Sequence, residues 1–151
     1  MRRSIVLALT LCSSSLAAQQ HPLAGIWQLS YPAGVQIENG VRTVLMGDAE
    51  LTIEAQGDSL IATIAYESTP DRPLRPPSRM AAMAGAGPVV FVQRSMATLN
   101  TDGNQREAVA LSTWTLVANG DALEGTVARR IEGFAEGDQD PQPVKGTRRK
   151  G

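Results

Sequence analysis

Alternation of apolar and polar residues with a period of two constrains the fold of this chain more than any other feature. Residues 51–67, LTIEAQGDSLIATIAYE, alternate on both sides of Gly57-Asp58, and residues 112–132, STWTLVANGDALEGTVARRIE, alternate around Asn119-Gly120-Asp121. A period of two is that of a β-strand, and a Gly-Asp or Asn-Gly pair between two such runs is typical of a hairpin turn. The chain is therefore predicted to be built from antiparallel hairpins.

The two hairpins also resemble each other. QGDSLIATIA and NGDALEGTVA align without a gap at an offset of 63 residues. Shared turn chemistry explains this likeness without any common function. The architectural inference is that both halves of the chain consist of antiparallel hairpins.

Further strands are predicted on either side of these hairpins. Apolar, strand-like runs cover residues 23–31, 41–51, 89–99, 105–116 and 143–150, with turns at Asn39-Gly40 and at Thr101-Asp102-Gly103. Seven or eight strands at close spacing, without a helical period, predict an all-β fold, an antiparallel up-and-down barrel of 7 to 8 strands. Closing such a meander into a barrel removes its exposed edges.

A segment rich in proline and arginine, residues 68–88, interrupts the strand pattern. Its prolines exclude a central strand and its arginines keep it hydrated: Pro70, Pro73, Pro76, Pro77, Pro88, Arg72, Arg75 and Arg79. Because it is longer than an ordinary hairpin loop, it is predicted to be a flexible surface loop, part of which (residues 69–80) would lie over a ligand. A polyproline II docking segment and a short helix over Met80–Ala86 are the alternatives.

The first residues are typical of a secretory signal peptide. Arg2 and Arg3 precede a short apolar run, residues 5–11, and small residues follow. The run is much shorter than the ~20 residues of a membrane-spanning helix. Cleavage after Ala17 or Ala18 is predicted, so that residues 1–18 form the signal peptide and residues 19–151 form a single β-barrel domain in the periplasm or outside the cell. The alternative is lipid anchoring at Cys12.

Charge and residue types exclude several functions. The chain has 14 basic and 15 acidic residues, and loss of Arg2 and Arg3 with the leader leaves 12 basic residues and a net charge of -3. That balance argues against nucleic acid or an anionic membrane as partner. Without Cys12, one histidine remains, His21, which gives neither a Ser-His-Asp set nor a zinc set. We therefore predict no catalytic residues, no metal site and no cofactor.

A family resemblance is carried by three residues and the strand order. Gly25-Ile26-Trp27 in the first strand, Arg148 in the last, and an up-and-down meander resemble the lipocalin signature, and the pattern is most similar to the small secreted lipocalin-like β domains of bacteria, whose activities are mostly unassigned. The resemblance implies that Gly25, Trp27 and Arg148 close one end of the barrel. A guanidinium over an indole ring would add cation–π energy there.

The predicted inner face mixes large and small side chains. It comprises Trp27, Leu29, Tyr31, Leu60, Ala62, Ile64, Phe91, Ala108, Ala110, Trp114, Leu116, Leu123, Gly125, Val127, Ile131, Val144 and Gly146. An eight-stranded barrel is just wide enough to be filled by side chains or to hold one small ligand. Small residues at 62, 110, 125 and 146 favour free space inside.

Arg129 falls in phase with this inner face. It is predicted to contact a ligand near the mouth of the barrel, the alternative being an arginine that extends to solvent. The candidate ligand-binding residues are Arg129, Trp114, Tyr31 and Phe91.

The predicted function is binding of a small hydrophobic or amphipathic ligand by a protein that is not an enzyme. The alternative is an interaction protein, such as a periplasmic protease inhibitor, that uses its exterior and its N-terminal segment, residues 19–22. An open apolar pocket would favour ligand binding, and a filled core with an exposed apolar patch would favour the alternative.

Overall fold

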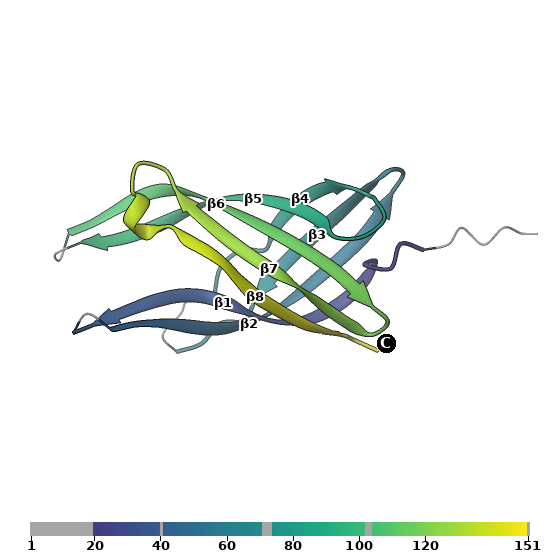
Figure 1. Ribbon diagram of the computed structural model, residues 1–151, viewed down its shortest axis with the longest axis horizontal. Coiled ribbons are helices and arrows are strands. Elements are labelled where there is room, and N and C mark those ends of the chain that lie inside the picture. Colours follow the sequence, from purple (N-terminus) through teal and green to yellow (C-terminus); the bar gives the residue numbers. More distant parts are fainter. Residues whose placement is uncertain (1–19, 40, 71–73, 102–103, 151) are drawn as a thin grey trace, which may run out of the picture.

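The computed structural model describes residues 20–39, 41–70, 74–101 and 104–150. In this part of the chain, eight antiparallel strands form one sheet in the order β4-β3-β2-β1-β8-β7-β6-β5, which curls into a nearly closed up-and-down barrel (Figure 1). The strands are β1 (Gly25–Glu38), β2 (Val41–Gln56), β3 (Ser59–Tyr66), β4 (Ser78–Met83), β5 (Val89–Thr101), β6 (Asn104–Asn119), β7 (Ala122–Ile131) and β8 (Gln139–Arg148). A 3-10 turn, η1 (Ala135–Gly137), precedes β8.

The predicted all-β barrel is confirmed. The predicted signal peptide, with Cys12, Ala17 and Ala18, lies outside the described residues, as do residues 102 and 103 of one predicted turn. The prediction for residues 68–88 is wrong in part, because Ser78–Met83 form β4 and neither a loop nor a helix. This stretch contains no proline, and β4 pairs with β3 as an end strand of the sheet, where flanking prolines are tolerated.

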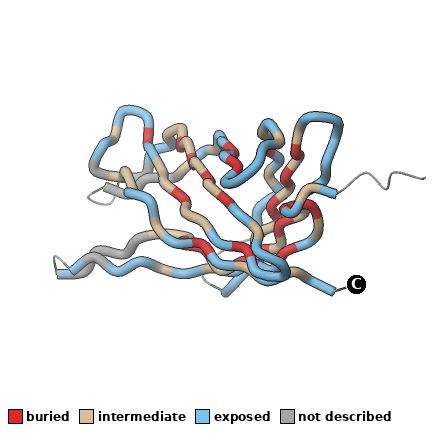
Figure 2. Tube along the Cα trace, turned by 45° about the vertical axis from the view of Figure 1, so that its right-hand side comes forward, coloured by how far each residue is buried: buried red, intermediate tan, exposed pale blue. Residues whose placement is uncertain are grey.

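The two ends of the barrel differ in how they are closed. At one end the β2–β3 and β6–β7 hairpins turn tightly at Gly57 and Gly120, whose φ angles of 59° and 62° favour glycine. At the other end the β1–β2 and β5–β6 hairpins extend beyond the remaining strands (Figure 1). Figure 2 shows buried positions concentrated in the body of the barrel and exposed ones along the extended hairpins. We call these the closed end and the open end.

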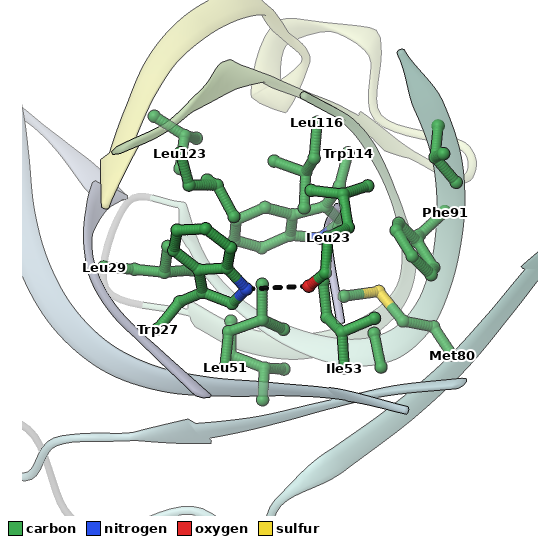
Figure 3. Close-up of a cluster of buried hydrophobic side chains, with 14 of the residues drawn as sticks. Leu23, Trp27, Leu29, Leu51, Ile53, Met80, Phe91, Trp114, Leu116 and Leu123 are labelled. Atoms are coloured by element: carbon green, nitrogen blue, oxygen red, sulfur yellow. Dashed lines mark hydrogen bonds between the residues drawn. The ribbon is translucent and has the colours of Figure 1, made fainter. Parts of the chain in front are cut away.

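The core fills the half of the barrel next to the closed end. Trp27, Leu23, Leu51 and Leu116 point toward one another across the barrel axis (Figure 3), and each is at most 1% exposed. The expected free space at Gly125 and Gly146 is absent. A Cβ on Gly125 would collide with the Thr115 carbonyl oxygen, and one on Gly146 would lie 2.6 Å from Leu29 Cδ2. These glycines allow close packing, so the inference that they leave a void is wrong.

The similarity of the two sequence hairpins corresponds to two similar halves, β1–β4 and β5–β8. Ala84 N–H donates to the Asp58 carbonyl at 2.8 Å, and Arg148 N–H donates to the Asp121 carbonyl at 2.8 Å, at equivalent points. The halves meet at two seams. One is a ladder of four residue pairs, Trp27–Ser30 with residues 145–148, and at the other β4 packs against β5 without a ladder in the described residues.

Candidate functional site

The closed end is built around Trp27. Its indole Nε1 donates a hydrogen bond to the Leu23 carbonyl at 2.8 Å, and the ring is completely buried (Figure 3). The Arg148 guanidinium carbon lies 4.1 Å from the ring centroid. Arg148 Nη1 donates to the Ala24 carbonyl at 2.6 Å, and Nη2 to the Pro22 carbonyl at 2.7 Å. The last strand is thereby tied to the segment that enters the first.

Gly25 provides the room for this arrangement. Its φ of 135° is rarely adopted by other residues, and a Cβ here would lie 2.5 Å from Arg148 Nη1. Arg148 Nε also lies 3.4 Å from Asp121 Oδ1. The three residues expected to close the barrel, Gly25, Trp27 and Arg148, therefore lie together. Side chains fill the interior of the barrel at this end.

Six inward-facing side chains mark the level at which the tightly packed core ends. We call them the mouth cluster: Tyr31, Tyr66, Gln93, Ser112, Trp114 and Arg129. They come from strands β1, β3, β5, β6 and β7. Register places Gln93 beside Ser112 and Ser112 beside Arg129 on neighbouring strands, so these three side chains share one face.

Hydrogen bonds join the cluster around Gln93, which is 5% exposed. Gln93 Nε2 donates to the Tyr66 hydroxyl oxygen at 2.8 Å, and Trp114 Nε1 donates to Gln93 Oε1 at 3.2 Å. The Tyr31 ring lies 5.6 Å from the Tyr66 ring and 5.9 Å from the Trp114 ring, centroid to centroid. A buried polar network whose members are satisfied is rigid, so these hydrogen bonds fix Tyr66, Gln93 and Trp114 relative to one another.

Arg129 is the charged member of the mouth cluster. Its Nε lies 3.5 Å from Ser112 Oγ, at the limit for a hydrogen bond. Burial lowers the pKa of Arg129, while Tyr66 and Tyr31 raise it and the charge of Arg75 lowers it further. Burial also raises the pKa of Tyr66, and the Gln93 hydrogen bond, Arg129 and Arg75 oppose that rise. Arg75, in the segment before β4, therefore acts electrostatically on the cluster.

Small residues line the barrel on the open side of the mouth cluster. Register pairs Ser95 with Ala110, Ala97 with Ala108, and Gly47 with Tyr31, all on the inward face. We call four of these the wall residues: Gly47, Ser95, Ala97 and Ala108. They are partly exposed although they face inward. Solvent reaches the inner face here, because the ladders to the neighbouring strands β3 and β7 end at Ala49 and Ala110.

The structure brings together three of the four predicted ligand-binding residues. Arg129, Trp114 and Tyr31 belong to the mouth cluster, whereas Phe91 is 0% exposed in the core, paired across the ladder with Trp114 (Figure 3). The predicted covering segment, residues 69–80, is also too long, because Met80 is buried in the core. Residues 71–73 of that segment lie outside the described residues.

Sequence reasoning missed Tyr66, Gln93 and Ser112. The signal was present, because each continues a period of two from apolar inward residues, as Tyr66 does from Ile64. Polar atoms at such positions need buried partners, and those partners lie on strands distant in the sequence.

Acidic side chains form no metal site in the part of the chain that the structure describes, where no group of three His, Cys, Asp or Glu side chains lies together. Asp138 instead accepts a hydrogen bond from Ile131 N–H at 2.8 Å and pairs with Arg130. Glu54, Asp58 and Glu124 are exposed. Among the described residues, no helix has the length and apolarity needed to cross a membrane.

Comparison with known proteins identified no relative of this chain. No protein-family model matches the chain, and neither the curated proteins nor the solved structures contain a significant match. The class of protein is therefore defined by the fold alone: an antiparallel, nearly closed up-and-down β-barrel.

Proposed function

We propose that this barrel binds a small hydrophobic or amphipathic molecule at its open end, between the mouth cluster and the wall residues. The observation that carries the proposal is the combination of small, partly exposed inward residues with a buried aromatic surface directly beneath them. Ligand sites in proteins are concave, mostly apolar, and furnished with few polar groups. Here those groups would be Arg129 and Ser112.

Two further features support a binding protein. The closed end and the hydrogen-bonded cluster are rigid, which lowers the entropy lost when a ligand is bound. The arrangement of Gly25, Trp27 and Arg148 supports the lipocalin-like resemblance, in which one end of a barrel is sealed.

The place of action is proposed to be the periplasm or the exterior. The support is the leader-like sequence of residues 1–18, with cleavage after Ala17 or Ala18. An intact mass of the protein from its native envelope fraction should begin at residue 18 or 19. A mass that begins at an acylated Cys12 would contradict this.

Ligand binding is tested by titrating the chain from residue 19 with a neutral, environment-sensitive apolar dye. In a Trp27→Phe background, Trp114 is the remaining tryptophan and reports from the mouth cluster. We expect saturable binding with one dye per chain. Ala108→Phe, which fills the wall, should abolish it, whereas Ala81→Phe, on an exposed position of β4, should not. Absence of saturable binding, or equal binding by Ala108→Phe, would refute the proposal.

A second candidate function, an interaction protein, is favoured by the filled core together with the apolar outer face of β5. Val90, Val92 and Met96 are 50, 55 and 60% exposed there, and β5 is an end strand of the sheet. Exposed apolar strips on such strands mark interaction sites. The N-terminal segment contributes less, because His21 Nε2 is hydrogen-bonded to the Gly85 carbonyl and the Pro22 carbonyl to Arg148. Concentration-dependent association in sedimentation, abolished by Val92→Glu, would support this candidate.

A further inference from the structure

We infer that the ligand is a single-chain amphiphile with an anionic head group, which lies against Arg129 at the inner end of the site while the chain extends toward the open end. This inference rests on the proposed function and specifies its ligand class. It follows from the surroundings of Arg129, from the charge of Arg75 and from the packing of the core below the mouth cluster.

Arg129 is a mostly buried cation without an anionic partner in the described residues. Its guanidinium contacts Ser112 Oγ through Nε, and neither Nη1 nor Nη2 has a hydrogen-bond partner there. No described carboxylate lies within 4.0 Å of it. Transfer of a charge from water into a protein interior is costly unless the charge is paired. The Nη groups can therefore gain more from an incoming anion than a solvated arginine would.

Three exposed arginines of the same barrel are paired with carboxylates, unlike Arg129. Arg94 pairs with Glu132, Arg130 with Asp138 and Asp140, and Arg149 with Glu50. These acidic residues therefore already face cations on the exterior. Arg129 is less exposed than these three arginines and has no carboxylate partner among the described residues, which fits an anion supplied by the ligand.

The charge of Arg75 adds to that of Arg129. Arg75 lies near enough to disfavour the charged form of Arg129 and to favour the ionised form of Tyr66. Two cations beside one aromatic cluster attract an anion and repel a cation. A planar guanidinium whose two NH2 groups have no partner among the described residues suits a carboxylate or a phosphate, which it can bind in a bidentate manner.

The direction of the ligand's alkyl chain follows from the packing of the side chains around the site. Below the mouth cluster, Phe91 and Leu116 are completely buried, so an alkyl chain has no room there. Above it, the wall residues Ala97 and Ala108 face inward and are partly exposed. The head group must therefore be the inner part of the ligand, and the chain must follow the wall outward.

The test compares dodecanoate with dodecan-1-ol, which share a chain length and differ in charge, by calorimetric titration of the chain from residue 19 at neutral pH. We expect dodecanoate to bind at least about tenfold more tightly than the alcohol. Arg129→Gln should remove this difference, and Arg129→Lys should keep part of it. The matched control is Arg94→Gln, which removes an exposed arginine from the outer face of β5 and should behave as the wild type. Thermal unfolding of each variant establishes that it is folded.

Each outcome decides between the two proposals. Equal binding of acid and alcohol, or a preference that survives in Arg129→Gln, would overturn the anionic head group and leave the proposed function standing. Absence of binding by both would overturn the proposed function as well. Inorganic phosphate should displace dodecanoate weakly from the wild type, which supports a charged subsite. If phosphate bound as tightly as dodecanoate, the alkyl chain would contribute nothing to the binding free energy, and the inference would fail.

Discussion

Trp27 shows at the scale of one residue how the closed end is held. Its ring contributes buried apolar area, its Nε1 is satisfied by the Leu23 carbonyl, and Arg148 covers one face. The guanidinium is itself held by the carbonyls of Ala24 and Pro22. Arg148 therefore acts through both its contact with the ring and its hydrogen bonds to the backbone.

Trp27→Ala should destabilise the barrel by about 3 to 5 kcal/mol, because it removes a fully buried indole and leaves a cavity. The control is the neighbouring Ile26→Ala. Ile26 points outward and is 41% exposed, so its loss should cost about 1 kcal/mol or less. Both values come from urea unfolding. An unchanged midpoint for Trp27→Ala would show that the closed end is not organised around this ring.

Tyr66 carries the pH dependence of the mouth cluster. Burial raises its pKa, so the folded state retains the phenolic proton more strongly than the unfolded chain does. The contribution of Tyr66 to the free energy of unfolding is fully present below the pKa of tyrosine in the unfolded chain, about 10. It is lost as the pH rises through the higher pKa of Tyr66 in the folded state. In Tyr31→Phe, Tyr66 is the remaining tyrosine, and its tyrosinate absorbance should titrate above about pH 10.

Arg129→Gln should move that Tyr66 midpoint further upward, because the charge of Arg129 lowers the pKa. Unfolding in denaturant should return the midpoint to the ordinary tyrosine value. A folded midpoint at or below that value would show that Tyr66 is not buried in the cluster.

At the scale of the strands, the approach of β6 to β7 depends on Gly125. A Cβ at this position would collide with the Thr115 carbonyl oxygen on the neighbouring strand. Gly125→Ala should therefore cost about 2 kcal/mol or more, as expected for overpacking. Gly85→Ala is the matched control, since nothing lies within 4 Å of the corresponding Cβ. Equal thermal midpoints for the two variants would contradict the close approach of β6 to β7.

The strands were predictable because their sequence signals are local. Alternation around Gly57 and Gly120 predicts both hairpins, and the structure confirms them. β4 was not predicted, because its strand character depends on pairing with β3, and prolines surround it in the sequence. The bulge between Pro32 and Gly34, which breaks the alternation within β1, also escaped prediction.

The candidate site was predictable in part for the same reason. Arg129 is conspicuous as a charge in an apolar register, and Trp114 and Tyr31 as large aromatic residues on the inner face. Gln93 and Tyr66 gain their meaning from a hydrogen bond between β3 and β5. The sequence pattern of neither strand predicts that hydrogen bond, because it forms only when the two halves of the barrel come together.

The whole molecule combines a sealed end with an end that solvent enters. The four-pair β1–β8 ladder and the packing of β4 on β5 join the two halves, and the extended hairpins project at the open end (Figure 1). The buried core around Trp27 stabilises the fold, and the proposed function places ligand binding at the mouth cluster and the wall residues. Changes at Arg129 should accordingly alter binding far more than folding.

Amide chemical shifts of the isotope-labelled protein, recorded during a titration with dodecanoate, test the central claim most directly. We predict saturable shifts at mouth-cluster and wall residues such as Ser112, Arg129 and Ala97, with none at Trp27 or Arg148 at the closed end. Shifts confined to the outer face of β5 at Val90 and Val92, or no saturable shifts at any residue, would contradict ligand binding at the open end.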